Sequence, residues 1–232
     1  MRKIFVHLGA GAGDLDKGAN FRCGFTEFIK KNYKKNDKIF CAEVNKFNIK
    51  KLKLTYKKYK NVKILNIGIA DKNQKKIKFF YTLQDSPHFQ VTSLKKDHVI
   101  KHYPNAEIKH FLTSAISIND FFKYKVKEKN IDYLSIDLEG IDFKILKSID
   151  LKKYNISNIS IEYLHLSNFQ KKFLINYLLK NGYSYFGFGY DHNNFDYLFK
   201  KKKNYWNIFL SKFFLWFISS KHYKFFNHFI FK

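Results

Sequence analysis

The stretch from Ile131 to Ile149, IDYLSIDLEGIDFKILKSI, most constrains the fold, because a strand pattern, an acidic turn and a helix pattern follow one another directly. The strand pattern is a short apolar run of Tyr133, Leu134 and Ile136. Three carboxylates, Asp137, Glu139 and Asp142, then cluster around Gly140. Ligands of open α/β sheets bind beyond the carboxyl ends of the strands, so these carboxylates are candidates for chemistry. The alternative is a solvated turn whose carboxylates favour the start of a helix through the helix dipole.

A second strand pattern, Ile4 to Val6, ends in a glycine-rich turn that contains His7, Gly9, Ala10, Gly11 and Gly13. Glycine at a strand-to-helix turn permits positive φ and close approach of a ligand to the backbone. A third strand pattern, Lys38 to Ala42, ends at Glu43, where a carboxylate that binds ribose is expected. These three elements in this order predict a nucleotide-type cofactor site.

Strands that alternate with helices along the chain predict an α/β fold with a mostly parallel sheet. Helix patterns cover Phe25 to Tyr33, Asn45 to Tyr59, the segment from Asn119 and Phe169 to Lys180. The apolar side chains of the second helix, among them Phe47, are expected in the core. Further strands are predicted at Val62–Ile69, Ile77–Leu83 and Asn158–Tyr163, and a terminal hairpin at Tyr183–Gly187 and Phe195–Phe199.

The segment from Gln84 to Thr113 has no clear period and carries both prolines of the chain. A loop of this length is usually a lid or a binding loop. Its histidines are His88, His98, His102 and His110. Apart from the broad spacing His98-x3-His102 they show no pattern of metal ligands, so solvated loop histidines are expected and no metal site is predicted.

The formal net charge of +25 invites a nucleic-acid partner. Nearly all of the positive charge is lysine, however, and Arg2 and Arg22 are the only arginines. A protein that reads phosphates or base edges usually uses more arginine, so no nucleic-acid partner is expected. The two cysteines, Cys23 and Cys41, form no disulfide framework or metal motif, and the N-terminus lacks a signal-peptide pattern. A cytoplasmic protein is the expectation.

The chain divides into a domain of residues 1–199 and a basic, aromatic tail of residues 200–232. The tail is too apolar for a solvated helix and too short to span a bilayer. It is expected to be a docking helix that covers this domain or a second copy of the chain in a homo-oligomer. The alternative is an interfacial helix in peripheral contact with the inner face of the membrane.

With these residues in view, the chain resembles the FkbM family of class I, Rossmann-like methyltransferases that use S-adenosylmethionine. The segment Ile136-Asp137-Leu138-Glu139-Gly140 is similar to the turn after the fourth strand of that family. Weaker similarities are the Gly9–Gly13 loop and the segments Ala42-Glu43-Val44-Asn45, Ile69-Ala70-Asp71, Ile118-Asn119-Asp120-Phe121 and Glu162-Tyr163. The resemblance implies a three-layer sandwich with a seven-stranded sheet that ends in an antiparallel hairpin.

The resemblance also implies O-methyl transfer to a hydroxyl of a saccharide or a related small molecule. Asp137 or Glu139 would orient or deprotonate that hydroxyl, and Glu162 and His165 would contact the acceptor. The residues that the resemblance assigns to S-adenosylmethionine are His7, Gly9, Ala10, Gly11, Gly13, Glu43, Val44, Ala70, Asp71 and Asp137.

Two positions depart from the family pattern, because His7 stands where the loop usually has Asp and Gly11 where it has Asn. These departures leave open a non-catalytic Rossmann-like scaffold that acts through its tail. The positive charge leaves open an RNA methyltransferase, although the chain shows no recognised RNA-binding motif.

Overall fold

A seven-stranded sheet forms the centre of the computed structural model, which describes residues 2–15, 23–190, 194–201, 209, 211–213 and 215–217. Its strand order is β11-β12-β10-β8-β1-β2-β3. Only β12 runs antiparallel to its neighbours in this sheet, and the other pairs are parallel. The strands are β1 (Ile4–Leu8), β2 (Lys38–Glu43), β3 (Val62–Asn66), β8 (Tyr133–Ile136), β10 (Asn158–Glu162), β11 (Ser184–Phe188) and β12 (Asp196–Lys200). The predicted parallel sheet with a C-terminal antiparallel hairpin is confirmed.

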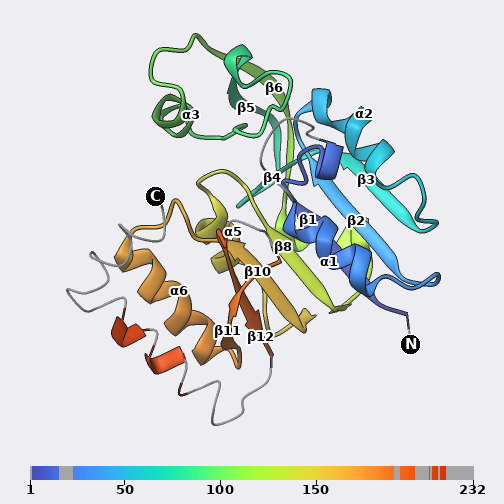
Figure 1. Cartoon of the computed structure of the whole chain (residues 1–232), viewed down its shortest axis with the longest axis vertical. Helices are drawn as coiled ribbons and strands as arrows, with labels where there is room; N and C mark the ends of the chain where they lie inside the picture. The colour runs from blue at the N-terminus through green and yellow to red at the C-terminus, as the bar shows by residue number, and fades with distance from the viewer. Residues whose placement is uncertain are drawn as a thin grey trace.

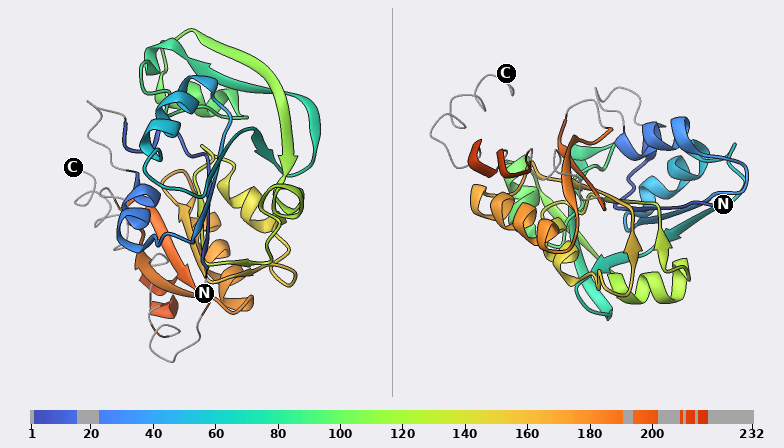
Figure 2. Two further views of the ribbon diagram at one scale, coloured as in Figure 1. Left: turned by 90° about the vertical axis from the view of Figure 1, so that its right-hand side faces the viewer. Right: turned by 90° about the horizontal axis from the view of Figure 1, so that it is seen from below.

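Helices cover both faces of this sheet and complete the predicted three layers (Figures 1 and 2). In β1, alternate side chains enter opposite cores: Val6 and Leu8 belong to one hydrophobic cluster and Phe5 to the other. The cluster around Phe5 includes residues of α1 (Gly24–Asn32) and α2 (Lys46–Thr55). The opposite cluster includes residues of α4 (Ile118–Asp120), the π-helical turn Phe121–Val126, α5 (Asp142–Ser148) and α6 (Asn168–Lys180).

The expected strand Val62–Ile69 is in fact two strands in two different sheets. Its first part is β3, and its second part is β4 (Gly68–Ala70), which pairs with β6 (Ile108–Ser117). The Asn66 side chain donates to the carbonyl oxygens of Glu43 and Val44 at 2.9 Å each, and this contact marks the end of β3. β6 also pairs with β5 (Gln74–Thr82), so β4, β6 and β5 form a smaller sheet.

The segment Gln84 to Thr113, expected as a long loop, contains α3 (Lys96–His102) and the first half of β6. Pairing with β5 explains the strand, because Phe111 lies opposite Phe79 and His110 opposite Phe80. With β5, this segment forms an arm at one end of the molecule (Figure 1), which we call the α3 arm and define as residues 74–117. The expectation of solvated histidines is wrong for His98, which is 8% exposed.

Two smaller expectations are also corrected. The helix predicted from Asn119 begins at Ile118, because the Ser117 hydroxyl accepts a hydrogen bond from the Asp120 amide and supplies the N-terminal cap. The second helix, expected from Asn45 to Tyr59, has Asn45 as its N-terminal cap and ends at Thr55. Phe47 of this helix is 46% exposed and stacks on Phe89 of the α3 arm, so it does not enter the core. The remaining short elements are β7 (Asn130–Ile131), β9 (Asn155–Ile156) and 3-10 turns at Gly13–Leu15 and Leu83–Asp85.

The described part of the tail is helical and lies against the domain. The Tyr185 amide donates to the Ser211 hydroxyl at 2.9 Å, and Leu215 and Phe217 pack on the core cluster that contains α6. Phe213 and Trp216 remain exposed. The turn at residues 191–193 and most of the tail lie outside the described residues. Among the helices that the structure describes, none has the length and apolarity that a membrane crossing needs.

Candidate active site

A cavity lies at the carboxyl ends of β1, β2, β8 and β10, where the sequence places its candidate residues. Eleven of these candidates line it: His7, Gly9, Ala10, Gly11, Gly13, Glu43, Val44, Asp137, Glu139, Glu162 and His165. The cavity is therefore shared by residues predicted for the cofactor and residues predicted for the acceptor.

The glycine loop after β1 has the backbone geometry that the sequence predicts. Gly9 has φ +74° and Gly13 has φ +64°. A Cβ on Gly9 would lie 1.6 Å from the Asp137 carbonyl oxygen, so a side chain has no space there. The Ala42 carbonyl oxygen accepts hydrogen bonds from the amides of Gly9 at 2.9 Å and Ala10 at 3.1 Å. These contacts fix the loop against both the end of β2 and the turn after β8.

Glu43 connects the glycine loop to the start of α2. The residue is 5% exposed. Its carboxylate accepts hydrogen bonds from the Gly11 amide at 2.7 Å and the Asn45 amide at 2.6 Å. The Asn45 side chain in turn donates to the Thr92 hydroxyl at 3.0 Å, which brings in the α3 arm. These contacts fix the Glu43 carboxylate at the junction of the glycine loop and α2.

His7 is a buried, neutral histidine in this site. It is 4% exposed, and its ring stacks on Phe25 with the centroids 4.5 Å apart. Burial lowers the pKa of His7 to about 3, because the protonated ring would lose its hydration. Its Nδ1 atom is buried and has no hydrogen-bond partner among the described residues. A bound ligand would give this atom the partner that buried polar groups normally have.

The acidic turn after β8 is held in place by Asp142. Its two carboxylate oxygens accept from the Leu138 amide at 2.5 Å and the Gly140 amide at 3.0 Å. Within this turn, Glu139 has φ +50° and Gly140 has φ +92°. Glu139 is thus a non-glycine residue in the left-handed region, which is uncommon and often found at functional sites. Burial raises the pKa of Asp142 to about 6.

Carboxyl groups that follow β8, begin α5 and end β10 meet beside this turn. Atoms of Asp137, Asp142 and Glu162 lie within 4.8 Å of one another. Burial, followed by the charge of Glu139, raises the pKa of Asp137 well above its usual value, and burial followed by Asp137 does the same for Glu162. Glu162 Oε1 lies 3.2 Å from His165 Nε2, whereas its buried Oε2 has no partner among the described residues. The site therefore combines carboxyl groups whose proton affinity exceeds the ordinary value.

Two predicted cofactor residues do not line the cavity. Ala70 is fully buried in β4. Asp71 follows it and forms an ion pair with Lys144 at 2.9 Å, a contact that lowers the pKa of Asp71. From the same part of the chain, Ile67 and Ile69 line the cavity.

The α3 arm supplies lining residues that the sequence did not indicate. Four consecutive residues, Phe89 to Thr92, line the cavity together with His102. Their segment has no hydrophobic period, so its length predicted a lid or a binding loop but no individual lining residue. On the other side, Asp196 of β12 lines the cavity and accepts from the Ser160 hydroxyl at 2.9 Å.

Comparison with known protein families identifies the domain. The chain matches the Methyltransferase FkbM domain over residues 16–185, which is most of its length. The chain belongs to the FkbM methyltransferase family. The matched range begins after β1 and the glycine loop, so the assignment does not depend on the two departures from the family pattern, His7 and Gly11. Methyl transfer from S-adenosylmethionine is the chemistry of this FkbM domain.

Solved structures give weaker likenesses. A precorrin-6y C5,15-methyltransferase from Geobacter metallireducens GS-15 is 12% identical, with TM-score 0.44 and coverage of 88% of this chain and 82% of that chain. A ribosomal protein L11 methylase from Lactobacillus delbrueckii subsp. bulgaricus is 10% identical, with TM-score 0.38 and coverage of 88% and 72%. TrmK of M. capricolum, in complex with S-adenosyl-homocysteine, is 12% identical, with TM-score 0.36 and coverage of 87% and 63%. No curated protein matches the chain.

The cavity fits S-adenosylmethionine on the evidence of its own residues. The glycine loop offers a backbone that a ligand can approach closely, and a Cβ on Gly11 would meet no atom within 4 Å. Glu43 at the end of β2 is the carboxylate expected to accept hydrogen bonds from ribose hydroxyls. The buried atoms His7 Nδ1 and Glu162 Oε2, which have no hydrogen-bond partner in the described part of the chain, are further polar groups that a ligand can satisfy.

Proposed function

We propose that this FkbM protein is an O-methyltransferase whose acceptor is a hydroxyl of a saccharide or a related small, polyhydroxylated molecule. The observation that carries the proposal is the polar wall of the cavity formed by Asp137, Glu139, Glu162 and His165. Carboxyl and imidazole groups suit an acceptor with several hydroxyls, because each hydroxyl both donates and accepts hydrogen bonds.

Methyl transfer to a hydroxyl needs a group that takes the hydroxyl proton. Asp137 and Glu139 are the two candidates, and they differ in their contacts. The Glu139 carboxylate lies 2.9 Å from His98 Nε2, whereas no hydrogen bond from a described residue reaches the Asp137 carboxylate. Burial raises the pKa of both carboxyl groups, so the pKa does not separate them, and the preference rests on the hydrogen bond that occupies Glu139. Asp137 is therefore the preferred proton acceptor, and Glu139 is a positioning group.

When bound, S-adenosylmethionine supplies a methyl group on a positively charged sulfur. Transfer of this methyl group to the acceptor oxygen would leave a neutral thioether, and Asp137 would take the proton of the acceptor hydroxyl. Glu162 and His165 orient the acceptor. Much of the rate acceleration then comes from holding the reactants in line, as for other bimolecular reactions in enclosed sites.

The experiment is an acceptor screen with radiolabelled S-adenosylmethionine. Mono- and oligosaccharides, a bacterial polysaccharide fraction and total RNA are offered separately, and labelled products are identified by mass spectrometry. A methyl ether on a saccharide is the expected product. Asp137→Asn should lower the turnover number at least about 100-fold, the usual contribution of a general base. Asp71→Asn is the matched control, because Asp71 lies outside the cavity, and it should leave turnover unchanged.

Other outcomes have definite meanings. Label found in RNA and absent from saccharides would overturn the proposed acceptor. Label found in neither, with no binding of S-adenosylmethionine, would favour the non-catalytic scaffold. Full turnover in Asp137→Asn would remove Asp137 from proton transfer.

A further inference from the structure

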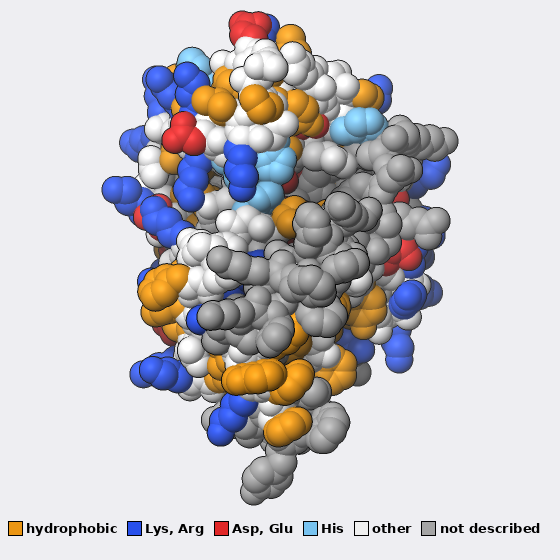
Figure 3. Space-filling view, turned by 60° about the vertical axis from the view of Figure 1, so that its left-hand side comes forward, with side chains coloured by type: hydrophobic (Ala, Val, Ile, Leu, Met, Phe, Trp, Pro, Cys, Tyr) orange, Lys and Arg blue, Asp and Glu red, His pale blue; other side chains and the backbone are white. Residues whose placement is uncertain are grey.

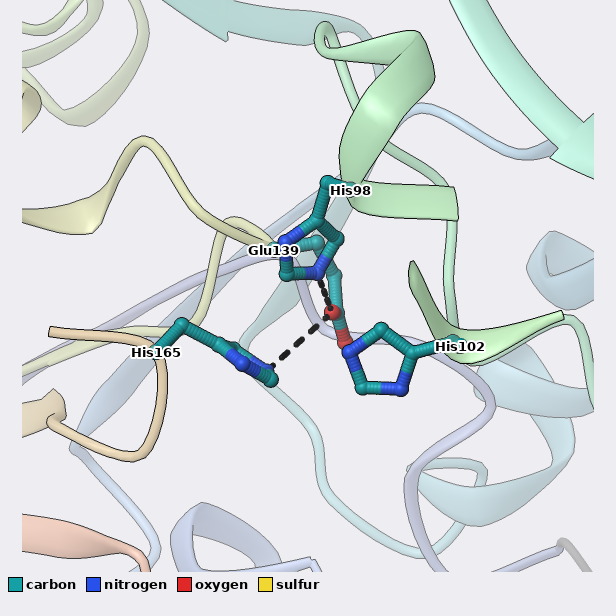
Figure 4. A group of neighbouring side chains, drawn as sticks. All are labelled: His98, His102, Glu139 and His165. Atoms are coloured by element: carbon teal, nitrogen blue, oxygen red, sulfur yellow. Dashed lines mark hydrogen bonds and ion pairs between the residues drawn. The ribbon is translucent and has the colours of Figure 1, made fainter. Parts of the chain in front are cut away.

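Three histidines and a glutamate converge at one edge of the cavity. His98 and His102 come from α3, Glu139 from the turn after β8, and His165 from the loop after β10. One side-chain nitrogen or oxygen of each lies within 4.8 Å of those of the others. Figure 4 shows the three imidazole rings arranged around the Glu139 carboxylate. We call this group the histidine cluster.

Hydrogen bonds within the cluster do not account for its arrangement. One of them joins His98 Nε2 to Glu139 Oε2 at 2.9 Å. His165 Nε2 lies farther from the same oxygen, at 3.9 Å. No hydrogen bond links the ring of His102 to another described residue, although the ring centroids of His98 and His165 both lie 4.9 Å from its own. The three rings thus lie close together around one carboxylate although only one of them forms a hydrogen bond with it, an arrangement that suits a shared metal ion.

The imidazoles are in the form that a metal ion requires. Burial is the largest cause that lowers the pKa of His98 to about 4 and the pKa of His165 to about 3, and the neighbouring histidines add to both shifts. Burial also lowers the pKa of His102. All three rings are therefore neutral near pH 7, and each offers one nitrogen lone pair.

Surrounding contacts hold the cluster in shape. The Ser93 hydroxyl donates to the Glu139 carbonyl oxygen at 2.7 Å, and Lys95 Nζ donates to the Gly140 carbonyl oxygen at 2.7 Å. A Cβ on Gly140 would lie 2.7 Å from His98 Nδ1, so glycine at this position makes room for the ring. Supporting contacts of this kind orient the ligands of metal sites.

We propose that His98, His102, Glu139 and His165 bind a divalent transition-metal ion, with Zn²⁺ preferred, at the acceptor side of the cavity. Imidazole nitrogens with one carboxylate suit Zn²⁺, whereas Mg²⁺ and Ca²⁺ prefer oxygen ligands. His102, Glu139 and His165 also line the cavity, so an ion at this position faces it. His102 is exposed, and histidine side chains reach the surface beside lysines on the face drawn in Figure 3, which gives the ion an entry path.

The consequence for catalysis rests on the proposed function. A hydroxyl coordinated to the ion has a lower pKa, so its proton passes more readily to Asp137. Glu139 and His98 would then bind the ion in place of their hydrogen bond to each other, and His165 would orient the acceptor through the ion. Asp137 remains the proton acceptor.

The test uses the full-length chain without an affinity tag, stripped of metal with a chelator. Calorimetric titration with Zn²⁺ and the visible absorption spectrum with Co²⁺ measure metal binding without any methyl acceptor. One site per chain is expected for Zn²⁺, with a rise in melting temperature that Mg²⁺ does not produce. His102→Ala should weaken Zn²⁺ binding at least about tenfold, and its exposed position makes misfolding of this variant a small risk. His110→Ala, a histidine of β6 outside the cluster, is the matched control and should bind like the wild type.

Each result separates the two proposals. No saturable Zn²⁺ or Co²⁺ binding by the wild-type chain would overturn the metal site, as would equal losses in His102→Ala and His110→Ala. Metal binding that depends on His102 in a protein that methylates no hydroxyl would support the site and overturn the proposed function. Turnover that chelation leaves unchanged would overturn the role of the ion in activating the acceptor.

Discussion

Replacing Glu43 with alanine should weaken both the cofactor site and the fold, because one carboxylate serves two backbone amides and the expected ribose position. Hydrogen bonds to a charged group contribute about 1.5 to 3 kcal/mol each. Glu43 accepts such bonds from the amides of Gly11 and Asn45, and water that enters the cavity of the variant would recover part of the loss. We therefore expect the free energy of unfolding to fall by about 2 kcal/mol, or about 4 to 8 °C in melting temperature for a domain of this size.

Cofactor affinity should fall separately. Loss of a charged partner for the ribose hydroxyls corresponds to about 1.5 to 3 kcal/mol, which is about a 10- to 150-fold increase in the Kd of S-adenosylmethionine. Calorimetric titration measures the Kd, and thermal unfolding without cofactor measures the stability. Glu43→Gln should give intermediate values in both, because its single carbonyl oxygen can replace only one of the two carboxylate acceptors.

The matched control is Glu128→Ala. Glu128 pairs with Arg2 at 2.7 Å and Lys38 at 3.1 Å on the surface, and such pairs contribute at most about 1 kcal/mol. This variant should bind the cofactor normally. An unchanged Kd in Glu43→Ala would refute the assignment of Glu43 to the ribose, and an unchanged melting temperature would refute its role in holding the glycine loop.

Three further predictions follow from the same cavity. Gly9→Ala should unfold at a much lower temperature than Gly11→Ala. Both glycines have positive φ, but only a Cβ at position 9 would collide with the Asp137 carbonyl oxygen. Equal melting temperatures of the two variants would contradict this prediction. Asp142→Ala removes the acceptor of two amides of the acidic turn, so the free energy of unfolding, measured with denaturant, should fall by at least about 1.5 kcal/mol. In steady-state kinetics this variant should lose more turnover than cofactor affinity. Glu162→Gln should raise the melting temperature at pH 8 but not at pH 4. The pKa of Glu162 is raised in the folded protein, so its carboxyl group destabilises the fold only above the unfolded pKa of about 4.5. An equal gain at both pH values would argue against a charge effect.

The sequence predicted the parts of the site that lie at the ends of strands. The glycine loop, Glu43 and the acidic turn each follow an apolar run directly, and parallel strands bring their carboxyl ends to one edge of the sheet. Local pattern and tertiary position therefore agree for these residues. Ala70 and Asp71 also follow an apolar run, but the chain leaves the large sheet at Ile67, so their strand lies in another sheet.

The histidine cluster could not be predicted in the same way, because its members come from three separate elements. His102 and His165 are 63 positions apart (165 minus 102), and only the placement of α3 against the core brings their rings to a centroid distance of 4.9 Å. That placement depends on the pairing of β5 with β6. The register of this pair brings aromatic side chains together in a segment with no clear period, so the sequence pattern does not specify it.

Ser93 connects the α3 arm to the turn that carries Glu139, and this connection restrains both segments. Its backbone exchanges two hydrogen bonds with Phe80 of β5, at 2.7 and 3.0 Å, while its hydroxyl holds the Glu139 carbonyl oxygen. The hydrogen-exchange rates of the amides of residues 91–93 and 138–140 should accordingly change together when conditions change. Rates that change independently would show that this connection is not rigid. The position of the α3 arm and the backbone of the turn that carries Glu139 are thus coupled through one hydroxyl group.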